Sequence, residues 1–318
     1  MSGDLPVRPN DVLEALARIR PHVHRTPVLT STQLDERVAG SVFLKCENLQ
    51  RVGAFKMRGA TNAIAQLPPD ALARGVVTHS SGNHAQAVAL AARRLGTSAT
   101  IVMPENAPRV KREATAQYGA RIVSCKATQA DRERTTAAIM EETGAVLVHP
   151  YDHPHIVAGQ GTAALELLDE IEALDLVLAP VGGGGLISGT TLAAGTRSGV
   201  EVIGCEPEGA NDAFRSLRDG RRVTVQVPNT ICDGLLTCLG ELPFRILAAH
   251  GVEIATVTDA QVRDAMLFLY ERTKLVVEPS AAVPVAALLA GRVPAKGRRV
   301  GVILSGGNVD VRAWIASL

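Results

Sequence analysis

Residues 174–189 read Leu-Asp-Leu-Val-Leu-Ala-Pro-Val-Gly-Gly-Gly-Gly-Leu-Ile-Ser-Gly, and this stretch decides the fold. Its first half is a short apolar run that stops at Pro180, which predicts a buried β-strand. A glycine turn then opens a helical pattern with Gly182, Gly183, Gly184, Gly185 and Leu186. A buried strand followed by a turn and a helix is typical of a parallel sheet covered by helices.

The same alternation runs through most of the chain. Short β-rich runs predict strands at residues 76–79, 99–103, 121–124, 146–149, 174–180, 201–205 and 299–304. Helical patterns lie between them at residues 83–95, 108–118, 130–143 and 156–173. This order predicts an α/β protein with two open, twisted, mostly parallel sheets and flanking helices. The first four strands are compact enough for a small domain of their own.

The composition suits such a core and excludes one class of partner. Hydrophobic residues make up 46% of the chain and aromatic residues only 3%, so the core must consist of aliphatic side chains, as in buried parallel strands. The 33 basic residues nearly balance the 32 acidic ones, for a net charge of +1. This balance argues against a nucleic acid partner.

The cysteines and the N-terminus indicate a cytoplasmic protein. The 5 cysteines are odd in number and none are spaced as CxxC, so neither a disulfide framework nor a zinc ribbon is predicted. The N-terminus has no signal-peptide pattern, and no segment is typical of a membrane span. We therefore expect a reducing, cytoplasmic location and no membrane partner.

The glycine turn is predicted to bind a phosphate group. Successive glycines let backbone N–H groups approach an anion, and the helix that follows adds a favourable partial charge. Two alternatives stay open. In a dinucleotide-binding fingerprint the third glycine would fall on Ile187 or Ser188, and no acidic residue ends the next strand until Glu206. A purely structural turn is the other alternative, and four successive glycines favour the phosphate over it.

Lys56 is the candidate reactive residue. The segment Gly53-Ala-Phe-Lys-Met-Arg-Gly-Ala60 places this amine next to Phe55, in an apolar and glycine-flanked setting. Burial of an amine favours its neutral form, which is a nucleophile and a base. A solvated surface lysine is the alternative when this segment is taken alone.

Two polar turns follow predicted strands. The first consists of Ser80, Ser81, Gly82, Asn83 and His84. Its hydroxyl, amide and helix N–H groups make a receptor for a carboxylate, although a helix N-cap with a satisfied histidine explains it equally well. The second turn begins with Ser305, at the edge where open parallel sheets bind ligands. Taken alone, this second segment is only a turn.

The combination points to a cofactor. An amine, a phosphate site, a carboxylate receptor and a strand-end serine fit a phosphorylated aldehyde that binds a lysine as a Schiff base and acts on amino acids. Pyridoxal 5'-phosphate (PLP) matches this description.

Several separate motifs occur in order along nearly the whole chain. They are His24-Arg-Thr-Pro-Val-Leu29, Lys45-Cys-Glu-Asn48, residues 53–60, the turn at 80–84, Ala158-Gly-Gln-Gly-Thr162, the glycine turn, Glu278-Pro-Ser-Ala281 and Ser305-Gly-Gly-Asn308. This series resembles the serine/threonine dehydratase and serine racemase family, the fold-type II PLP enzymes with a tryptophan synthase β-like fold. The resemblance implies a large PLP-binding domain of residues 1–64 and 148–318, a small substrate-closing domain of residues 65–147, and a homodimer.

The resemblance also implies roles for the matching residues. Lys56 would carry the cofactor and then remove the α-proton of the substrate, while residues 182–186 would hold the phosphate. Asn83 would hydrogen-bond the phenolic oxygen of the ring, with Phe55 beside the ring. Ser305 would face the pyridine nitrogen. Because a serine does not keep that nitrogen protonated as a carboxylate would, the cofactor favours elimination from Cβ.

The implied reaction is β-elimination of water from a β-hydroxy amino acid to give a 2-oxo acid and ammonia, with L-threonine or L-serine as the default substrate. Serine racemase, 3-hydroxyaspartate dehydratase and a catalytically silent PLP-binding homologue are alternatives. In racemase-like members, a serine matching Ser81 exchanges a proton on the face opposite the lysine. Arg132 and Glu133 also align with a polar pair of the racemases, but residues 149–154 resemble the dehydratases. We therefore predict dehydration as the main activity.

Two segments are candidates for metal binding. Racemase-type members bind magnesium or calcium through residues that match Glu206, the carbonyl of Ala210 and Asp212, so the resemblance implies Mg²⁺ or Ca²⁺ here. By spacing alone, a solvated acidic loop explains this segment nearly as well. The histidines at 149, 153 and 155 also lie close together, but nearby prolines prevent a regular helical face, which favours a turn with exposed histidines over a zinc site.

Overall fold

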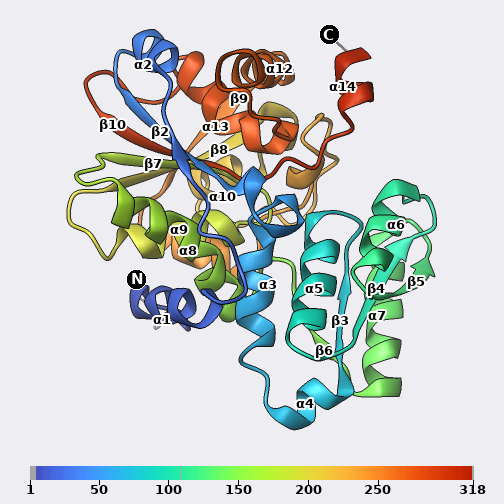
Figure 1. Ribbon diagram of the computed structural model, residues 1–318. Coiled ribbons are helices and arrows are strands. Elements are labelled where there is room, and N and C mark those ends of the chain that lie inside the picture. Colours follow the sequence, from blue (N-terminus) through green and yellow to red (C-terminus); the bar gives the residue numbers. More distant parts are fainter. Residues whose placement is uncertain (1–4, 108, 317–318) are drawn as a thin grey trace.

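The structure is a computed structural model that describes residues 5–107 and 109–316 (Figure 1). Its strands are β1 (Val28–Leu29), β2 (Ser41–Cys46), β3 (Val76–His79), β4 (Ala99–Pro104), β5 (Arg121–Cys125), β6 (Val146–Leu147), β7 (Leu176–Pro180), β8 (Glu201–Pro207), β9 (Glu253–Val257) and β10 (Arg299–Leu304). Its α-helices are α1 (Pro9–Ile19), α2 (Thr32–Val38), α3 (Lys56–Ile64), α4 (Pro69–Arg74), α5 (Asn83–Arg94), α6 (Arg109–Gln117), α7 (Gln129–Thr143), α8 (Pro154–Glu170), α9 (Gly185–Ala194), α10 (Asp212–Arg218), α11 (Glu241–Ala249), α12 (Asp259–Phe268), α13 (Pro279–Leu289) and α14 (Val311–Ala316). Shorter helical turns are η1 (Glu47–Leu49), η2 (Arg51–Gly53), η3 (Glu208–Ala210), η4 (Asp233–Leu235) and η5 (Leu269–Thr273).

These strands form two sheets. The larger sheet has the strand order β1-β2-β10-β7-β8-β9, and the smaller one has the order β5-β4-β3-β6. Neighbouring strands are parallel in both sheets, except that β1 is antiparallel to β2. The predicted α/β fold with two mostly parallel sheets is therefore confirmed.

Helices cover both faces of the six-stranded sheet. On one face α2, α12 and α13 pack against the strands, and their apolar side chains form a core with Leu34 and Met266. On the other face lie α1, α8, α9 and α11, which bury Leu165 and Ile187. Every residue of β7 is buried, as expected for a central strand covered on both faces.

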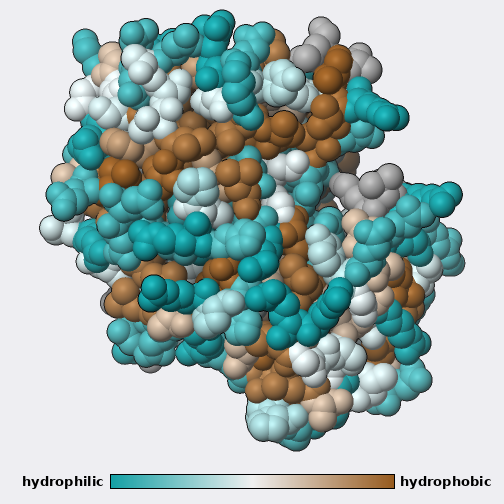
Figure 2. All heavy atoms as spheres, viewed as in Figure 1, coloured by the Kyte–Doolittle hydropathy of each residue, from teal (hydrophilic) through white to brown (hydrophobic). Residues whose placement is uncertain are grey.

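The four-stranded sheet has its own core. Apolar residues of α3 and α5, such as Met57 and Val88, pack against one face, while Ile139 of α7 packs against the other. All its strands lie within residues 76–147, inside the predicted small domain. The domain bounds themselves stay a prediction. Figure 1 shows α3 running between the two sheets, and Figure 2 shows a notch in the surface between the same two parts.

Several predicted elements have different ends in the structure. The helix predicted at residues 156–173 is α8. It begins earlier because the His153 ring accepts a hydrogen bond from the backbone N–H of His155 and Pro154 occupies the first turn, and it ends earlier because the backbone is extended at Ile171. The strand predicted at 146–149 contains only Val146 and Leu147. The helix predicted at 108–118 begins at Arg109, and residue 108 lies outside the described residues.

All five cysteines are free thiols, and four of them are buried. Across the described ranges, no helix is both long and apolar enough to cross a membrane.

Candidate active site

The glycine loop between β7 and α9 is closely packed and has room only for glycine. A Cβ atom on Gly183 would lie 2.3 Å from the ring of Tyr151, and one on Gly184 would lie 2.4 Å from Leu239. Gly184 also has a φ of 88°, in the left-handed region that favours glycine. The loop ends at the N-terminus of α9, where the first N–H groups have no partner within the helix. The loop therefore ends on N–H donors that are unpaired within the helix, which are groups that bind anions.

A second set of contacts places Lys56 beside the end of β10. The N–H of Phe55 donates to the carbonyl of Ser305 over 3.0 Å, and the N–H of Gly307 donates to the carbonyl of Gly53 over 2.9 Å. Lys56 follows this paired segment directly and begins α3. The structure thus brings together Lys56 and Ser305, two predicted site residues that lie far apart in the sequence.

The amine of Lys56 lies in a partly buried and polarised place. Its Nζ donates a hydrogen bond to the carbonyl of Pro150 over 2.7 Å, and it lies 5.1 Å from the ring centroid of Phe55. Burial lowers the pKa of Lys56 to about 8, and the negative charge of Glu278 limits this fall. The neutral amine, which is the nucleophilic form, is therefore much more accessible near neutral pH than for an ordinary lysine.

Pro150 links this amine to the glycine loop. The residue after it, Tyr151, covers Gly183 with its ring, and Asp152 accepts hydrogen bonds from the backbone N–H groups of Glu241 and Leu242, at the start of α11. The segment is therefore held at both ends. Lys56, Ser305 and the glycine loop belong to one continuous set of contacts.

Asn83 begins α5 and meets the carboxylate of Glu278, which belongs to the motif at residues 278–281 but to which the sequence patterns assigned no role. Its side-chain nitrogen lies 2.9 and 3.0 Å from the two carboxylate oxygens of Glu278, and its oxygen accepts a hydrogen bond from Asn308 over 2.8 Å. Glu278 is buried and immediately precedes α13. The motif marks its position before a helix that starts with proline, but its contact with Asn83 is visible only in the structure.

The rest of the predicted carboxylate receptor is more open. A Cβ atom on Gly82 would meet nothing within 4 Å, and the N–H of Gly82 donates to the Ser80 hydroxyl over 3.3 Å. No hydrogen bond joins the Ser81 side chain to another residue that the structure describes. The ring of His84 is buried and its Nε2 lies 3.0 Å from the carbonyl of Val148, which leaves its Nδ1 as an acceptor. A role for His84 in binding a carboxylate stays a prediction, and this tautomer does not favour it.

A series of polar groups extends from Lys56, because His149 interacts with the Lys56 amine and with His79, and His79 interacts with Arg132. Burial lowers the pKa of His79, and the adjacent charge of Arg132 lowers it further while Glu133 opposes both. Burial lowers the pKa of His149 to about 4, against the charge of Asp152. The Nε of Arg132 is buried and has no hydrogen-bond partner within the described part of the chain. A cation and neutral imidazoles therefore lie on this side of the site.

The acidic segment predicted to bind a metal is buried. Glu206 accepts hydrogen bonds from the N–H groups of Ala213 and Phe214, while Asp212 accepts from Gln226 over 2.6 Å and Leu239 over 2.7 Å. Burial raises the pKa of both carboxyls, and the charge of Asp212 raises that of Glu206 further.

This burial decides between the two explanations of the segment. Neither Glu206 nor Asp212 is exposed to solvent, and Ala210 is buried beside them, so the alternative of a solvated acidic loop is wrong. Between residues 5 and 316, leaving out 108, no three or more His, Cys, Asp or Glu side chains form a group that could hold a metal ion. The predicted Mg²⁺ or Ca²⁺ site therefore has only two carboxylates, with the carbonyl of Ala210 as its third ligand. A zinc site at residues 149–155 has no support from the described residues.

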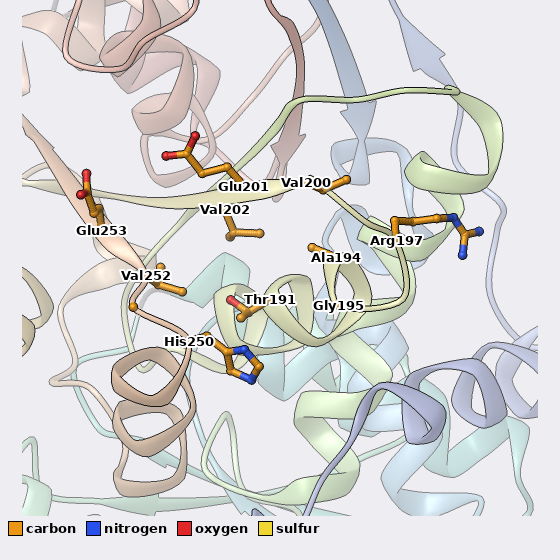
Figure 3. Close-up of a pocket in the computed structure, with 11 residues that line it drawn as sticks. Thr191, Ala194, Gly195, Arg197, Val200, Glu201, Val202, His250, Val252 and Glu253 are labelled. Atoms are coloured by element: carbon orange, nitrogen blue, oxygen red, sulfur yellow. The ribbon is translucent and has the colours of Figure 1, made fainter. Parts of the chain in front are cut away.

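Two pockets of about 260 Å³ lie away from this set of contacts. Figure 3 shows one of them, at the N-terminal ends of β8 and β9, where Thr191, His250 and Glu253 line it. Its other charged residues already have partners, since Arg197 pairs with Asp169 and Glu201 pairs with Arg298. This pocket lies at the sheet edge opposite the glycine loop, and nothing in it indicates a ligand.

The chain matches known proteins along most of its length. Residues 19–306 match the family described as pyridoxal-phosphate dependent enzyme. The beta-hydroxyaspartate dehydratase of Paracoccus denitrificans is 46% identical over 302 residues, which cover 95% of this chain and 96% of that protein. The L-threo-3-hydroxyaspartate ammonia-lyase of Saccharomyces cerevisiae is 48% identical over 306 residues, covering 96% of this chain and 94% of that protein. The structure of maize serine racemase is similar with a TM-score of 0.94 and 42% identity, covering 98% of this chain and 96% of that one.

Proposed function

The chain belongs to the family of pyridoxal-phosphate dependent enzymes, and on that premise we propose that it eliminates water from a β-hydroxy amino acid and that the released enamino acid is then hydrolysed by water to a 2-oxo acid and ammonia. The main observation behind this proposal is the environment of the Lys56 amine. Burial brings its pKa to about 8, and a continuous set of contacts joins it to the glycine loop and to Ser305. Such an amine can bind an aldehyde and can also take up a proton.

The residues present fit the cofactor. Residues 182–186 offer backbone N–H groups and a helix N-terminus to a phosphate, in a loop where side chains would collide with Tyr151 and Leu239. Asn83 and Ser305 would meet the ring, with Phe55 beside it. When bound, the cofactor supplies an electron sink that makes the Cα–H bond of an amino acid acidic.

The chain's own contribution to the reaction is to move protons and to exclude water. Lys56 would take the α-proton at its Nζ, and the carbonyl of Pro150, 2.7 Å away, would accept a hydrogen bond from the protonated amine. Ser80, Ser81 and the N–H groups at the start of α5 would hold the substrate carboxylate. We propose that residues 65–147 move as a small domain to close this site, since the loop at Gly82 has open space around it.

Among β-hydroxy amino acids we favour 3-hydroxyaspartate. Two relatives at 46% and 48% identity carry names that specify hydroxyaspartate. A second substrate carboxylate also needs a cation, and Arg132 beside His79 has a buried Nε without a partner within the described ranges. L-threonine and L-serine, the substrates predicted from the sequence, are the second candidates.

Racemisation is the alternative activity. The similarity to maize serine racemase and the serine at position 81 support it. The Ser81 hydroxyl, however, has no described hydrogen-bond partner that would activate it as a base. We therefore propose elimination as the main reaction and racemisation of serine as a side reaction.

We further propose that Glu206, the carbonyl of Ala210 and Asp212 bind Mg²⁺ or Ca²⁺. Two buried carboxylates that repel each other form a set of hard oxygen ligands that a divalent cation would neutralise. The homodimer and the cytoplasmic location stay predictions.

A substrate comparison tests the proposed reaction. The PLP-loaded protein is incubated with L-threo-3-hydroxyaspartate, L-threonine and L-serine, and both the 2-oxo acid and D-serine are followed. We expect the wild-type protein to form the 2-oxo acid fastest from hydroxyaspartate and more slowly from L-threonine and L-serine. Lys56→Ala should form none. Faster formation of D-serine than of pyruvate would make the main assignment wrong, and no turnover of any substrate would favour a silent homologue.

A pair of arginine variants tests the choice of substrate. Arg132→Gln should lower kcat/KM for hydroxyaspartate by about tenfold to a hundredfold, because a charge-assisted hydrogen bond to the second carboxylate is lost. The effect on L-threonine should be small. Arg134→Gln, on the exposed face of the same helix, is the matched control. An equal loss for both substrates would contradict this role of Arg132.

A further inference from the structure

Glu278 occupies a position that the reaction outlined above does not use. It is buried, its N–H donates to the carbonyl of Gly306 over 3.0 Å, and a Cβ atom on Gly306 would lie 2.7 Å from one of its carboxylate oxygens. The backbone therefore closes around the carboxylate. Both of its oxygens face the side-chain nitrogen of Asn83, at 2.9 and 3.0 Å.

This contact fixes the direction of the Asn83 amide. An ionised carboxylate only accepts hydrogen bonds, so the nitrogen of Asn83 must face it. At the other end of the amide, the oxygen of Asn83 accepts from the nitrogen of Asn308 over 2.8 Å. The nitrogen of Asn308 is itself fixed, because it also donates to the backbone carbonyl of Val52 over 2.7 Å. Since acceptors stand at both ends of this chain, only one orientation of each amide satisfies it.

The far end of the chain is a strained turn next to Lys56. Val52 has a φ of 57° and a ψ of 12°, a left-handed conformation that is unfavourable for a β-branched residue. The hydrogen bond from Asn308 holds the carbonyl of this residue, and the turn leads through Gly53 into the segment that pairs with Ser305. The hydrogen-bonded chain therefore joins the amide expected at the cofactor ring to the backbone that positions the reactive amine.

We propose that Glu278 is a positioning residue that orients the Asn83 amide toward the cofactor ring and, through Asn308 and Val52, sets the turn that delivers Lys56. This inference rests on the proposed function only in taking PLP as the bound group. One hydrogen of the Asn83 nitrogen satisfies the carboxylate, and the other remains for the phenolic oxygen. A glutamine at position 278 would remove this constraint, because an amide donates as well as accepts.

Glu278 also acts on Lys56 through its charge. The titratable groups that interact with the Lys56 amine are Glu278, His84 and His149, and burial keeps both imidazoles neutral at neutral pH. The carboxylate is therefore the charge that opposes the effect of burial on the pKa of Lys56. Its removal should lower that pKa further, so the amine would become reactive at a lower pH.

Glu278→Gln tests both effects without relying on turnover. Binding of PLP to the cofactor-free protein is followed by the visible absorbance of the lysine-bound cofactor, as a function of PLP concentration and of pH. We expect about tenfold weaker binding, because a charge-assisted hydrogen bond is lost. We also expect a shift of the absorbance band. The midpoint of the pH dependence of PLP binding should be lower, because the pKa of Lys56 falls when the charge of Glu278 is removed. Glu278→Asp keeps the charge and should keep the midpoint, while Glu253→Gln, on the exposed start of β9, is the matched control.

The same measurements in an Asn83→Ala background separate positioning from mere structural support. If Glu278 acts through Asn83, Glu278→Gln should no longer change the band or the affinity in that background, but should still lower the pH midpoint. If Glu278→Gln weakens PLP binding by the same factor with and without Asn83→Ala, the proposal is overturned. An unchanged absorbance band in Glu278→Gln alone would also overturn it. If Glu278→Gln does not fold, Asn308→Ala carries the test, because it releases the other end of the Asn83 amide and should shift the band without moving the pH midpoint. A wild-type protein that bound no PLP would instead overturn the proposed function.

Discussion

Two buried groups of carboxylates in this molecule differ in how their negative charge is compensated. Glu47 and Glu166 pair with Arg58 at 2.7 and 2.8 Å, and Lys45 adds a third ion pair to Glu166 at 2.7 Å. These partners lower the pKa of Glu166 in spite of its burial.

Glu206 and Asp212, by contrast, are stabilised by N–H donors and only in part by the charge of Arg215, and their pKa values are raised. Burying a carboxylate is costly unless a positive charge compensates for it. The first cluster carries its own cations, whereas the second needs a proton or an added cation.

The two clusters lie in different parts of the fold, and their locations indicate different roles. The neutralised cluster joins β2, α3 and α8 through Arg58, which lies in the first turn of the helix that begins at Lys56. It needs nothing from solution and is part of the scaffold. The other cluster lies where β8 ends and α10 begins, and under the proposed metal binding the stability of that region would depend on the metal content of the medium.

The largest expected effect comes from breaking the neutralised cluster. Arg58→Met removes the cation shared by Glu47 and Glu166 and leaves two carboxylates buried with only Lys45 to compensate. We expect the free energy of unfolding to fall by about 3–5 kcal/mol, measured by urea denaturation. Arg109→Met, which removes an exposed ion pair with Glu113, is the control and should cost less than about 1 kcal/mol. Equal losses in the two variants would show that the cluster contributes no more than a surface pair.

The second expected effect comes from adding a divalent cation, which the proposed site at Glu206 and Asp212 would bind. Adding Ca²⁺ or Mg²⁺ to chelator-treated protein should stabilise it by about 2.7 kcal/mol at a concentration one hundred times the Kd, seen as a rise in Tm. Glu206→Gln should abolish the response. Glu208→Gln, an exposed carboxylate two residues further along, should keep it. An unchanged Tm in the wild-type protein would remove the metal proposal and leave protonation as the way in which this cluster is tolerated.

The contrast also shows what the sequence can predict. The strand at residues 299–304 and the glycine turn between a strand and a helix are local patterns, and each is found where it was expected. β9 was not predicted, because Glu253–Val257 is a half-buried edge strand without an apolar run. Arg58 and Glu166 are 108 residues apart, and Asn83 and Glu278 are 195 apart, so only tertiary packing brings them together. Charge compensation and side-chain orientation therefore had to come from the structure.

The smallest expected effect concerns the cost of burying a positive charge, which Lys56 tests as the carboxylates test the cost of burying a negative one. Its pKa is about 8 in the folded protein but about 10.4 in an unfolded chain. Between these two pH values the unfolded chain binds more protons than the folded one, so stability should rise as pH increases from about 8 to about 10.4. Because Lys56 keeps some contact with water, we expect a gain of about 1–2 kcal/mol. Urea denaturation of the cofactor-free protein at several pH values measures it. Lys56→Met should remove this part of the pH dependence, and an unchanged slope in that variant would mean that the amine is solvated and that burial does not set its reactivity.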